Sequence, residues 1–322
     1  MNTHKFKMQG SLSISTIIFI LVVVVAGGAY AYIDNQADLR AEEVIISIVE
    51  DAKAQGVDIS YDTIDTSPIA RSITLQNFKI SGAQQAPDVI LGNVVISGLN
   101  WRSLQDAQDH IPLSMSIEIT DGKILLDEEM IGDDQDLKSF VEVMGDELNF
   151  TLHANYNVDE STGILTASLV QQLDDNFSLK ANLEFGNTGW LAYVKTGEPL
   201  DNLILDLLAT TLNDLSIAFR NEGIIEKIRT VSAKQTGLSS QQLTEQAVQN
   251  IRQIQASLQN YNPVYSLMLE ELIKFTEQPN QLLISIDPEQ PLTSDDFLKV
   301  FMGGQSAPFD LMKKAQLFIR AN

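Results

Sequence analysis

The pattern of apolar and polar positions divides the chain into five predicted parts. A short leading stretch, 1–11, precedes 12–33, where no residue is charged. About 20 apolar residues cross a ~30 Å hydrocarbon core as a helix, so this run predicts a transmembrane anchor. Apolar positions recur at helical spacing over 34–56, which predicts a juxtamembrane helix. Alternating positions dominate 57–198, and helical spacing returns over 199–322.

The alternating part, 57–198, predicts a series of half-buried strands. Its clearest run is Leu113–Ile119, where apolar residues alternate strictly with polar ones. Asp121-Gly122 follows, and Asp-Gly between two such runs favours a type I′ hairpin turn. Three later runs alternate in the same way and predict a three-strand meander: 150–158, 165–169 and 177–185.

The last part, 199–322, predicts helices with short strands between them. Apolar residues from Leu200 to Leu215 form one stripe at helical spacing, which is typical of an amphipathic helix. The other predicted elements are a strand over 215–219, helices over 224–237, 239–258, 263–277 and 295–302, and strands over 282–286 and 315–321. Packed on the sheet, these helices give an α+β fold: an N-terminal transmembrane helix, then an antiparallel β-rich sheet partly covered by C-terminal helices.

The charges around 12–33 indicate that the rest of the chain is exported. Lys5 and Lys7 precede this run, and all 43 acidic residues follow it. Lysines on a short leading side keep that end in the cytoplasm. The net charge of −22 also argues against a nucleic-acid partner, because phosphate would be repelled.

A cleaved signal peptide is the alternative to an anchor. Ala29-Tyr30-Ala31 fits the small-x-small pattern of a cleavage site, and cleavage near Ala31 would yield a secreted protein. We favour the uncleaved anchor because the apolar run continues to Ile33, and because Tyr30 and Tyr32 suit the aromatic belt at a membrane interface.

Two stretches of sequence resemble a group of bacterial envelope proteins. The first is Tyr61–Ile80 (YDTIDTSPIARSITLQNFKI) with Val94–Leu99 (VVISGL), and the second is Leu272–Leu292 (LIKFTEQPNQLLISIDPEQPL). With the N-terminal anchor, this layout resembles AsmA-like and YdgA-like periplasmic proteins. The resemblance implies a single-pass protein of the bacterial inner membrane with its C-terminal bulk in the periplasm. It also implies an apolar groove between β layers and a role in lipid transport or membrane homeostasis, but the helical second half departs from the long-groove pattern.

The sequence contains no recognisable catalytic or metal-binding motif. Zero cysteines remove disulfides, thiol nucleophiles and thiolate zinc sites together. His4, His110 and His153 are the only histidines, and their spacing does not match a metal site. Six acidic residues lie between Asp127 and Asp136, but without the glycine and glutamate of an EF-hand loop, so we expect a solvated loop. We therefore predict no catalytic, cofactor-binding or metal-binding residue.

The apolar stripes offer the one candidate binding site. Four residues on two predicted helices are expected to line an apolar pocket that holds phospholipid: Leu203, Leu207, Ile251 and Ile254. The same stripes equally fit an ordinary core beneath a sheet. The expected function is therefore a non-enzymatic, membrane-anchored envelope protein that handles lipid. A scaffold that binds an envelope protein partner and an exported carboxylate-dependent hydrolase are the alternatives.

Overall fold

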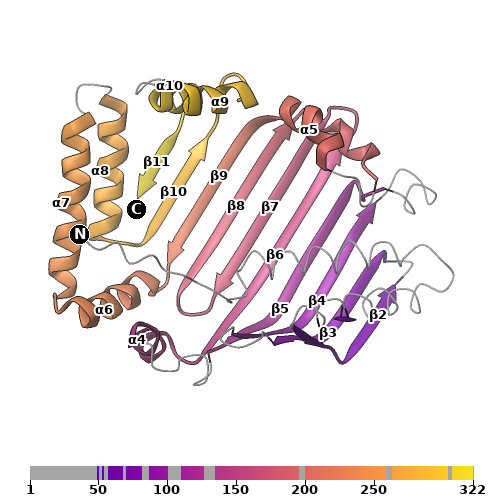
Figure 1. Cartoon of the computed structure of the whole chain (residues 1–322), viewed down its shortest axis with the longest axis horizontal. Helices are drawn as coiled ribbons and strands as arrows, with labels where there is room; N and C mark the ends of the chain where they lie inside the picture. The colour runs from indigo at the N-terminus through magenta and orange to yellow at the C-terminus, as the bar shows by residue number, and fades with distance from the viewer. Residues whose placement is uncertain are drawn as a thin grey trace. The chain divides into compact units, whose positions relative to one another are not determined.

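The computed structural model has an α+β fold, and the strand pairs described below are antiparallel (Figure 1). It describes residues 49–50, 53, 57–67, 70–81, 87–100, 110–126, 135–195, 200–258, 263–303 and 307–321. These residues form eleven strands and seven α-helices, so the predicted fold class is confirmed at this level. The predicted anchor, 12–33, and most of the juxtamembrane helix lie outside the described residues.

The chain divides into two compact units, each described here by itself. The first unit takes the described residues up to Leu99 together with Ile117–Thr151, and the second takes Asn100–Ser116 and Leu152–Asn322. β5 (Ser114–Leu125) and β6 (Glu147–Asp159) each contribute residues to both units.

Antiparallel strands form the first unit. Besides parts of β5 and β6, its elements are β1 (Asp58–Ser60), β2 (Thr63–Ser67), β3 (Ser72–Ser81), β4 (Asp88–Asn100) and the helix α4 (Gln135–Met144). β3 pairs with β1, β2 and β4. One face of the β3–β4 pair is fully buried, because Ile73, Leu75, Ile80, Leu91 and Ile96 have almost no exposed surface.

In β3, β4 and β5 the regular alternation of buried and exposed residues is interrupted once, at neighbouring positions of the three strands. Buried positions step by three residues there instead of two: Leu75 to Phe78, Leu91 to Val94 and Ile119 to Gly122. Asn77 (φ 50°) and Asp121 (φ 53°) adopt left-handed backbone at this level. A Cβ added to Gly92 would lie 2.7 Å from the Cβ of Asp121, so the glycine allows the two strands to approach closely.

The prediction of a hairpin turn at Asp121-Gly122 is wrong. β5 runs without a break from Ser114 to Leu125. A type I′ turn needs positive φ at both central residues, but of this pair only Asp121 has it. A Cβ on Gly122 would lie 2.7 Å from the ring of Phe150, so the glycine makes room for an aromatic neighbour instead of closing a turn.

The second unit is a series of antiparallel strands with helices at the strand ends and with α7 and α8 beside its last strand. Its strands besides β6 are β7 (Ile164–Leu173), β8 (Phe177–Gly186), β9 (Thr211–Asn221), β10 (Gln281–Ile286) and β11 (Phe318–Ala321). Its helices are the 3₁₀ turn η2 (Gly189–Tyr193), α5 (Leu200–Ala209), α6 (Ile224–Thr236), α7 (Ser240–Leu258), α8 (Pro263–Glu277), α9 (Ser294–Met302) and α10 (Ala307–Lys314). Each strand from β7 to β11 pairs with the next, and the predicted meander strands are confirmed.

One face of the second unit's strands is apolar. The pairs Ala167↔Leu183, Ala181↔Ile217 and Ile217↔Ile284 place apolar side chains in rows across four strands. At the far end of β9, Phe219 stacks on Phe177, and Phe275 of α8 meets Phe219 edge-on with ring centroids 6.0 Å apart. Apolar pairs across antiparallel strands stabilise the sheet.

The helix predicted over 200–215 ends early. α5 stops at Ala209, and β9 begins at Thr211. The register of β8 and β9 shifts at Asn213, since Phe185 pairs with Leu212 but Glu184 pairs with Asp214. This β-bulge places Leu212 and Leu215 on the same face although they are three residues apart. The β-bulge therefore produced a three-residue spacing of apolar residues that, in the sequence, is the same as the spacing in a helix.

Most other helix limits agree with the sequence. Gly237 ends α6 in the left-handed conformation, as a C-terminal glycine does. Ser239 accepts a hydrogen bond from the Gln242 backbone N–H, and its own N–H donates to Gln242 Oε1, so Ser239 caps α7. α8 begins at Pro263 as predicted, whereas α10 was not predicted.

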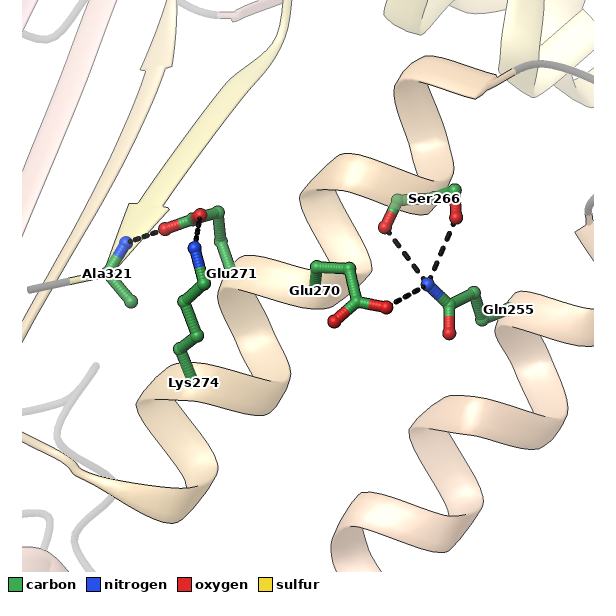
Figure 2. A network of polar contacts seen from close by, with 6 residues as sticks. All are labelled: Gln255, Ser266, Glu270, Glu271, Lys274 and Ala321. Atoms are coloured by element: carbon green, nitrogen blue, oxygen red, sulfur yellow. Dashed lines mark hydrogen bonds and ion pairs between the residues drawn. The ribbon is translucent and has the colours of Figure 1, made fainter.

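Polar contacts join α7, α8 and β11 (Figure 2). The amide of Gln255 on α7 donates to the carbonyl and hydroxyl of Ser266 and to Glu270 on α8. Glu271 accepts from Lys274 and, at 2.8 Å, from the backbone N–H of Ala321. The carboxylate of Glu271 thus accepts a hydrogen bond from a backbone N–H group of the last strand.

We predict that Gly92→Ala destabilises the protein by about 1–3 kcal/mol, because the new methyl group forces β4 away from Asp121. Urea unfolding followed by circular dichroism measures the change. Gly189→Ala is the matched control, since its added Cβ would meet only ordinary contacts, the nearest at 3.7 Å. Equal stability of Gly92→Ala and the wild type would contradict the close approach.

Candidate functional site

Apolar side chains of α5 and α9 form a groove at one end of the strands of the second unit. Figure 1 shows both helices at the strand end where β8 stops and β9 starts. The groove has a volume of about 400 Å³, within the range of small-molecule sites. Its lining is mostly apolar and consists of Phe185, Leu207, Leu208, Thr210, Thr211, Leu212, Leu292, Ser294, Phe297, Leu298 and Phe301.

Backbone pairing sets the floor of this groove. The N–H of Leu212 donates to the carbonyl of Leu292 at 2.9 Å, and the N–H of Leu292 donates back to Leu212 at the same distance. Leu292 is fully buried. Because Leu212 is the second residue of β9 and Leu292 lies just before α9, this reciprocal pair holds α9 beside the end of α5.

The C-terminal end of α5 is tied down by hydrogen bonds. Asn187 donates to the carbonyl of Ala209 at 3.1 Å, and Trp190 Nε1 donates to the Thr210 hydroxyl at 3.2 Å. The Thr210 hydroxyl in turn donates to the carbonyl of Asp206. The bond from Asn187 satisfies the Ala209 carbonyl, a group that a helix end leaves without an intrahelical partner. Together the contacts hold the end of α5 while its leucines remain exposed.

The N-terminus of α9 is held by a capping box. The backbone N–H and the hydroxyl of Thr293 both donate to Asp296 Oδ2 at 2.9 Å, and Lys314 of α10 binds the same carboxylate. Burial alone would raise the pKa of Asp296, but the hydrogen bonds from Lys314 and Thr293 lower it to about 2. The Ser294 hydroxyl donates to the Leu208 carbonyl at 2.7 Å, which joins α9 to α5.

The groove presents apolar surface and no titratable side chain. Each of its three hydroxyl residues donates a hydrogen bond inside the protein: Thr210 to Asp206, Thr211 to Asn213 and Ser294 to Leu208. A nucleophile needs an adjacent base, and the residues lining the groove supply none. The site chemistry therefore suits an apolar ligand.

The structure separates the four residues expected to line one pocket. Leu207 of α5 lines the groove, and Leu203 is half-buried on the same helix outside the lining. Ile251 and Ile254 lie on α7, and neither of them lines the groove. Figure 1 shows α5 at one end of the strands of the second unit, whereas α7 lies beside α8, the helix next to β11.

Sequence reasoning missed the α9 wall of the groove. Phe297, Leu298 and Phe301 recur at helical spacing, so the signal for an amphipathic helix was present. The partner of this helix was not visible in the sequence, because Leu207 lies about ninety residues before α9. The sequence pattern predicts a strand at Phe185 and a helix at Leu212, and neither pattern indicates that these two side chains line the same groove.

A second hollow, of about 540 Å³, lies between α8 and β11. Leu267, Met268 and Phe318 supply apolar surface there, and Glu271, Lys274 and Arg320 supply charge. Glu271 and Lys274 bind each other, and the hydrogen bonds from Lys274 and then Ala321 lower the pKa of Glu271. The hollow therefore carries charged side chains, two of which bind each other, and we regard it as secondary to the apolar α5–α9 groove.

Three carboxylates interact at the edge of β8, β9 and β10: Glu184 on β8, Asp214 on β9 and Asp287 directly after β10. Burial first, and then the charges of Asp287 and Glu184, raise the pKa of Asp214. Asn213 donates to Glu184 at 3.1 Å. Among the described residues no cluster of histidine and acidic side chains is arranged to hold a metal ion. The acidic stretch 127–134 lies outside the described residues.

The histidines in the described part of the chain lie away from the groove. His110 forms an isolated bridge with Lys195. His153 is exposed on β6 beside the amide of Asn155. His4 lies outside the described residues.

Comparison with known proteins gives no function. A family model described only as an uncharacterized protein matches residues 169–322, the range that includes α5, α9 and the groove. No curated protein matches the chain. Within the part that the structure describes, the helices lack the combination of length and apolar character that crossing a bilayer requires.

We predict that Asp296→Asn weakens the attachment of α9. The pKa of Asp296 in the folded protein, about 2, is below its ordinary value of 3.8. The carboxylate therefore stabilises the fold above pH 3.8, and this contribution is lost as the pH falls toward 2. The difference in Tm between wild type and Asp296→Asn should shrink over that interval.

Asp295→Asn is the matched control for this prediction. Asp295 is the neighbouring residue, is exposed, and lies in the same first turn of α9. Its substitution changes the net charge by the same amount and should alter Tm little at any pH. If both variants lose the same stability, net charge and not the capping box is responsible.

Proposed function

We propose that this chain is a non-enzymatic, membrane-anchored protein of the bacterial envelope that binds the acyl chain of a lipid in the α5–α9 groove. The observation that supports this most strongly is the groove itself. Its volume is about 400 Å³, and its lining is mostly apolar and contains no titratable residue. Its apolar rim remains exposed, since Leu207 is 47% exposed and Phe301 is 85% exposed. Burying such surface against a lipid chain is favourable at about 25 cal/mol per Å².

The proposal includes the N-terminal anchor and the partial covering of the sheet. The apolar run 12–33 with its leading lysines supports a single-pass topology with the acidic bulk in the periplasm. The contact of Phe275 on α8 with Phe219 on β9 supports the idea that C-terminal helices cover part of the apolar face.

We predict that a long-chain fatty acid carrying a diazirine labels peptides from α5 and α9 when the full chain, in detergent, is irradiated with it. Leu207→Asp should strongly reduce this labelling, because a charge in the groove wall costs the desolvation of a carboxylate. Mass spectrometry of the proteolysed protein gives the labelled positions and separates the groove from the anchor.

Ile254→Asp provides the control for this labelling. Ile254 is 51% exposed on α7, close to the exposure of Leu207, but it does not line the groove. Labelling of α5 and α9 should survive this change. Labelling confined to 12–33, or equal losses in the two variants, would exclude the groove as the lipid site.

We also predict the topology of the chain. Alkaline phosphatase fused after Asn322 should be active in a bacterial host, because this enzyme matures only outside the cytoplasm and the leading lysines favour export of the rest. A fluorescent protein that matures only in the cytoplasm, fused at the same point, is the control. Fluorescence without phosphatase activity would reject both the anchor and the proposed location.

A further inference from the structure

The most exposed apolar side chains of the described residues lie on α5 and α9. Of the large apolar residues that are exposed, Phe301 (85%), Leu205 (80%) and Met302 (79%) are the three most exposed. Five more of them, including Ile204 and Phe297, also belong to these two helices. Both helices lie at the same end of the strands of the second unit (Figure 1). Exposed apolar surface concentrated in this way marks an interaction site.

The groove accounts for only part of this surface. Phe301 lines the groove, but Leu205 and Met302 do not. Leu205 lies on α5 between the groove residue Leu207 and the start of the helix, and Met302 is the last residue of α9. These side chains project beyond the groove, so a single acyl chain held inside it would leave them in water.

The charges on the two helices indicate which kind of partner fits. Asp206 lies on α5, and α9 carries Asp295 and Asp296 against Lys299. This surface is not basic, so it offers no attraction to an acidic partner, and a second copy of a chain with a net charge of −22 would be repelled. The attraction therefore has to come from apolar burial.

The length of chain before the described strands keeps the fold close to a bilayer. Twenty-four residue steps lead from the end of the predicted anchor, Ile33, to Val57, with residues 34–56 between them. As a helix they span about 36 Å, and fully extended they reach about 80 Å. A tether of this length gives the anchored protein a high effective concentration at the surface of its own membrane, so a small apolar contact is enough.

We propose that α5 and α9 dip into the surface of the bilayer that holds the anchor, with Leu205, Phe301 and Met302 in the acyl-chain region. Helices that lie in the interface bury apolar side chains in this way. This inference rests on the proposed function and extends it: the groove between the two helices opens onto the lipid, so an acyl chain passes between bilayer and groove without crossing water. Because the surface is not basic, the contact does not depend on anionic lipids or on low salt.

The absence of cysteine makes this contact directly measurable. The full chain carrying Leu205→Cys or Met302→Cys, both outside the groove lining, is labelled with the fluorophore NBD and reconstituted in phosphatidylcholine liposomes. We expect blue-shifted emission that is quenched by phosphatidylcholine with a doxyl spin label on its acyl chain. Both the blue shift and the quenching should be unchanged in high salt. Ile254→Cys on α7 and Ile228→Cys on α6, both exposed, are the matched controls and should remain unshifted and unquenched.

Two results would overturn the proposal. Unshifted emission at positions 205 and 302 would place these side chains in water. A blue shift without doxyl quenching would mean that protein covers them, either a second copy or another chain. Neither result depends on the fatty-acid labelling of the groove in detergent, so the contact with the bilayer can fail while lipid binding stands, and the reverse holds as well.

Discussion

The reciprocal backbone hydrogen bonds between Leu212 and Leu292 are the constraint on which the candidate site depends. They join two points eighty residues apart in the chain, the start of β9 and the segment before α9. Once this pair forms, α9 has to begin beside the end of α5, and the Ser294 hydroxyl reaches the Leu208 carbonyl. Leu292 is buried against this point, which protects the two hydrogen bonds from competition with water.

The site combines rigid supports with an exposed apolar surface. The end of α5 is fixed by Asn187 and Trp190, and the start of α9 is fixed by the capping box of Thr293 and Asp296. The leucines and phenylalanines between these supports gain little from the interior of the protein. Exposing these side chains to water is unfavourable. Covering them with lipid or another apolar partner removes this free-energy cost.

Irregular strands explain where sequence reasoning failed. The strands predicted from plain alternation were confirmed, as with β7 and β8, because alternation reports directly on a half-buried sheet. The stripe from Leu200 to Leu215 was divided wrongly, since the bulge at Asn213 gave a strand the spacing of a helix. At Asp121-Gly122 the favoured turn residues serve a continuous strand, because Phe150 occupies the space beside Gly122. In each case a neighbouring strand or side chain decided the outcome.

The sequence by itself determined the α+β class, the limits of helices such as α6 and α8, and the apolar helices that were available for a site. These properties depend on local spacing and on capping residues such as Gly237 and Ser239, which act over a few neighbours. Only the tertiary structure decided that Leu207 meets Phe297 and Phe301 at one groove, whereas Ile251 and Ile254 lie on another helix. An apolar stripe in the sequence does not indicate which surface it packs against, because apolar burial is non-directional. Strand pairing brings distant segments together and so decides which apolar surfaces meet.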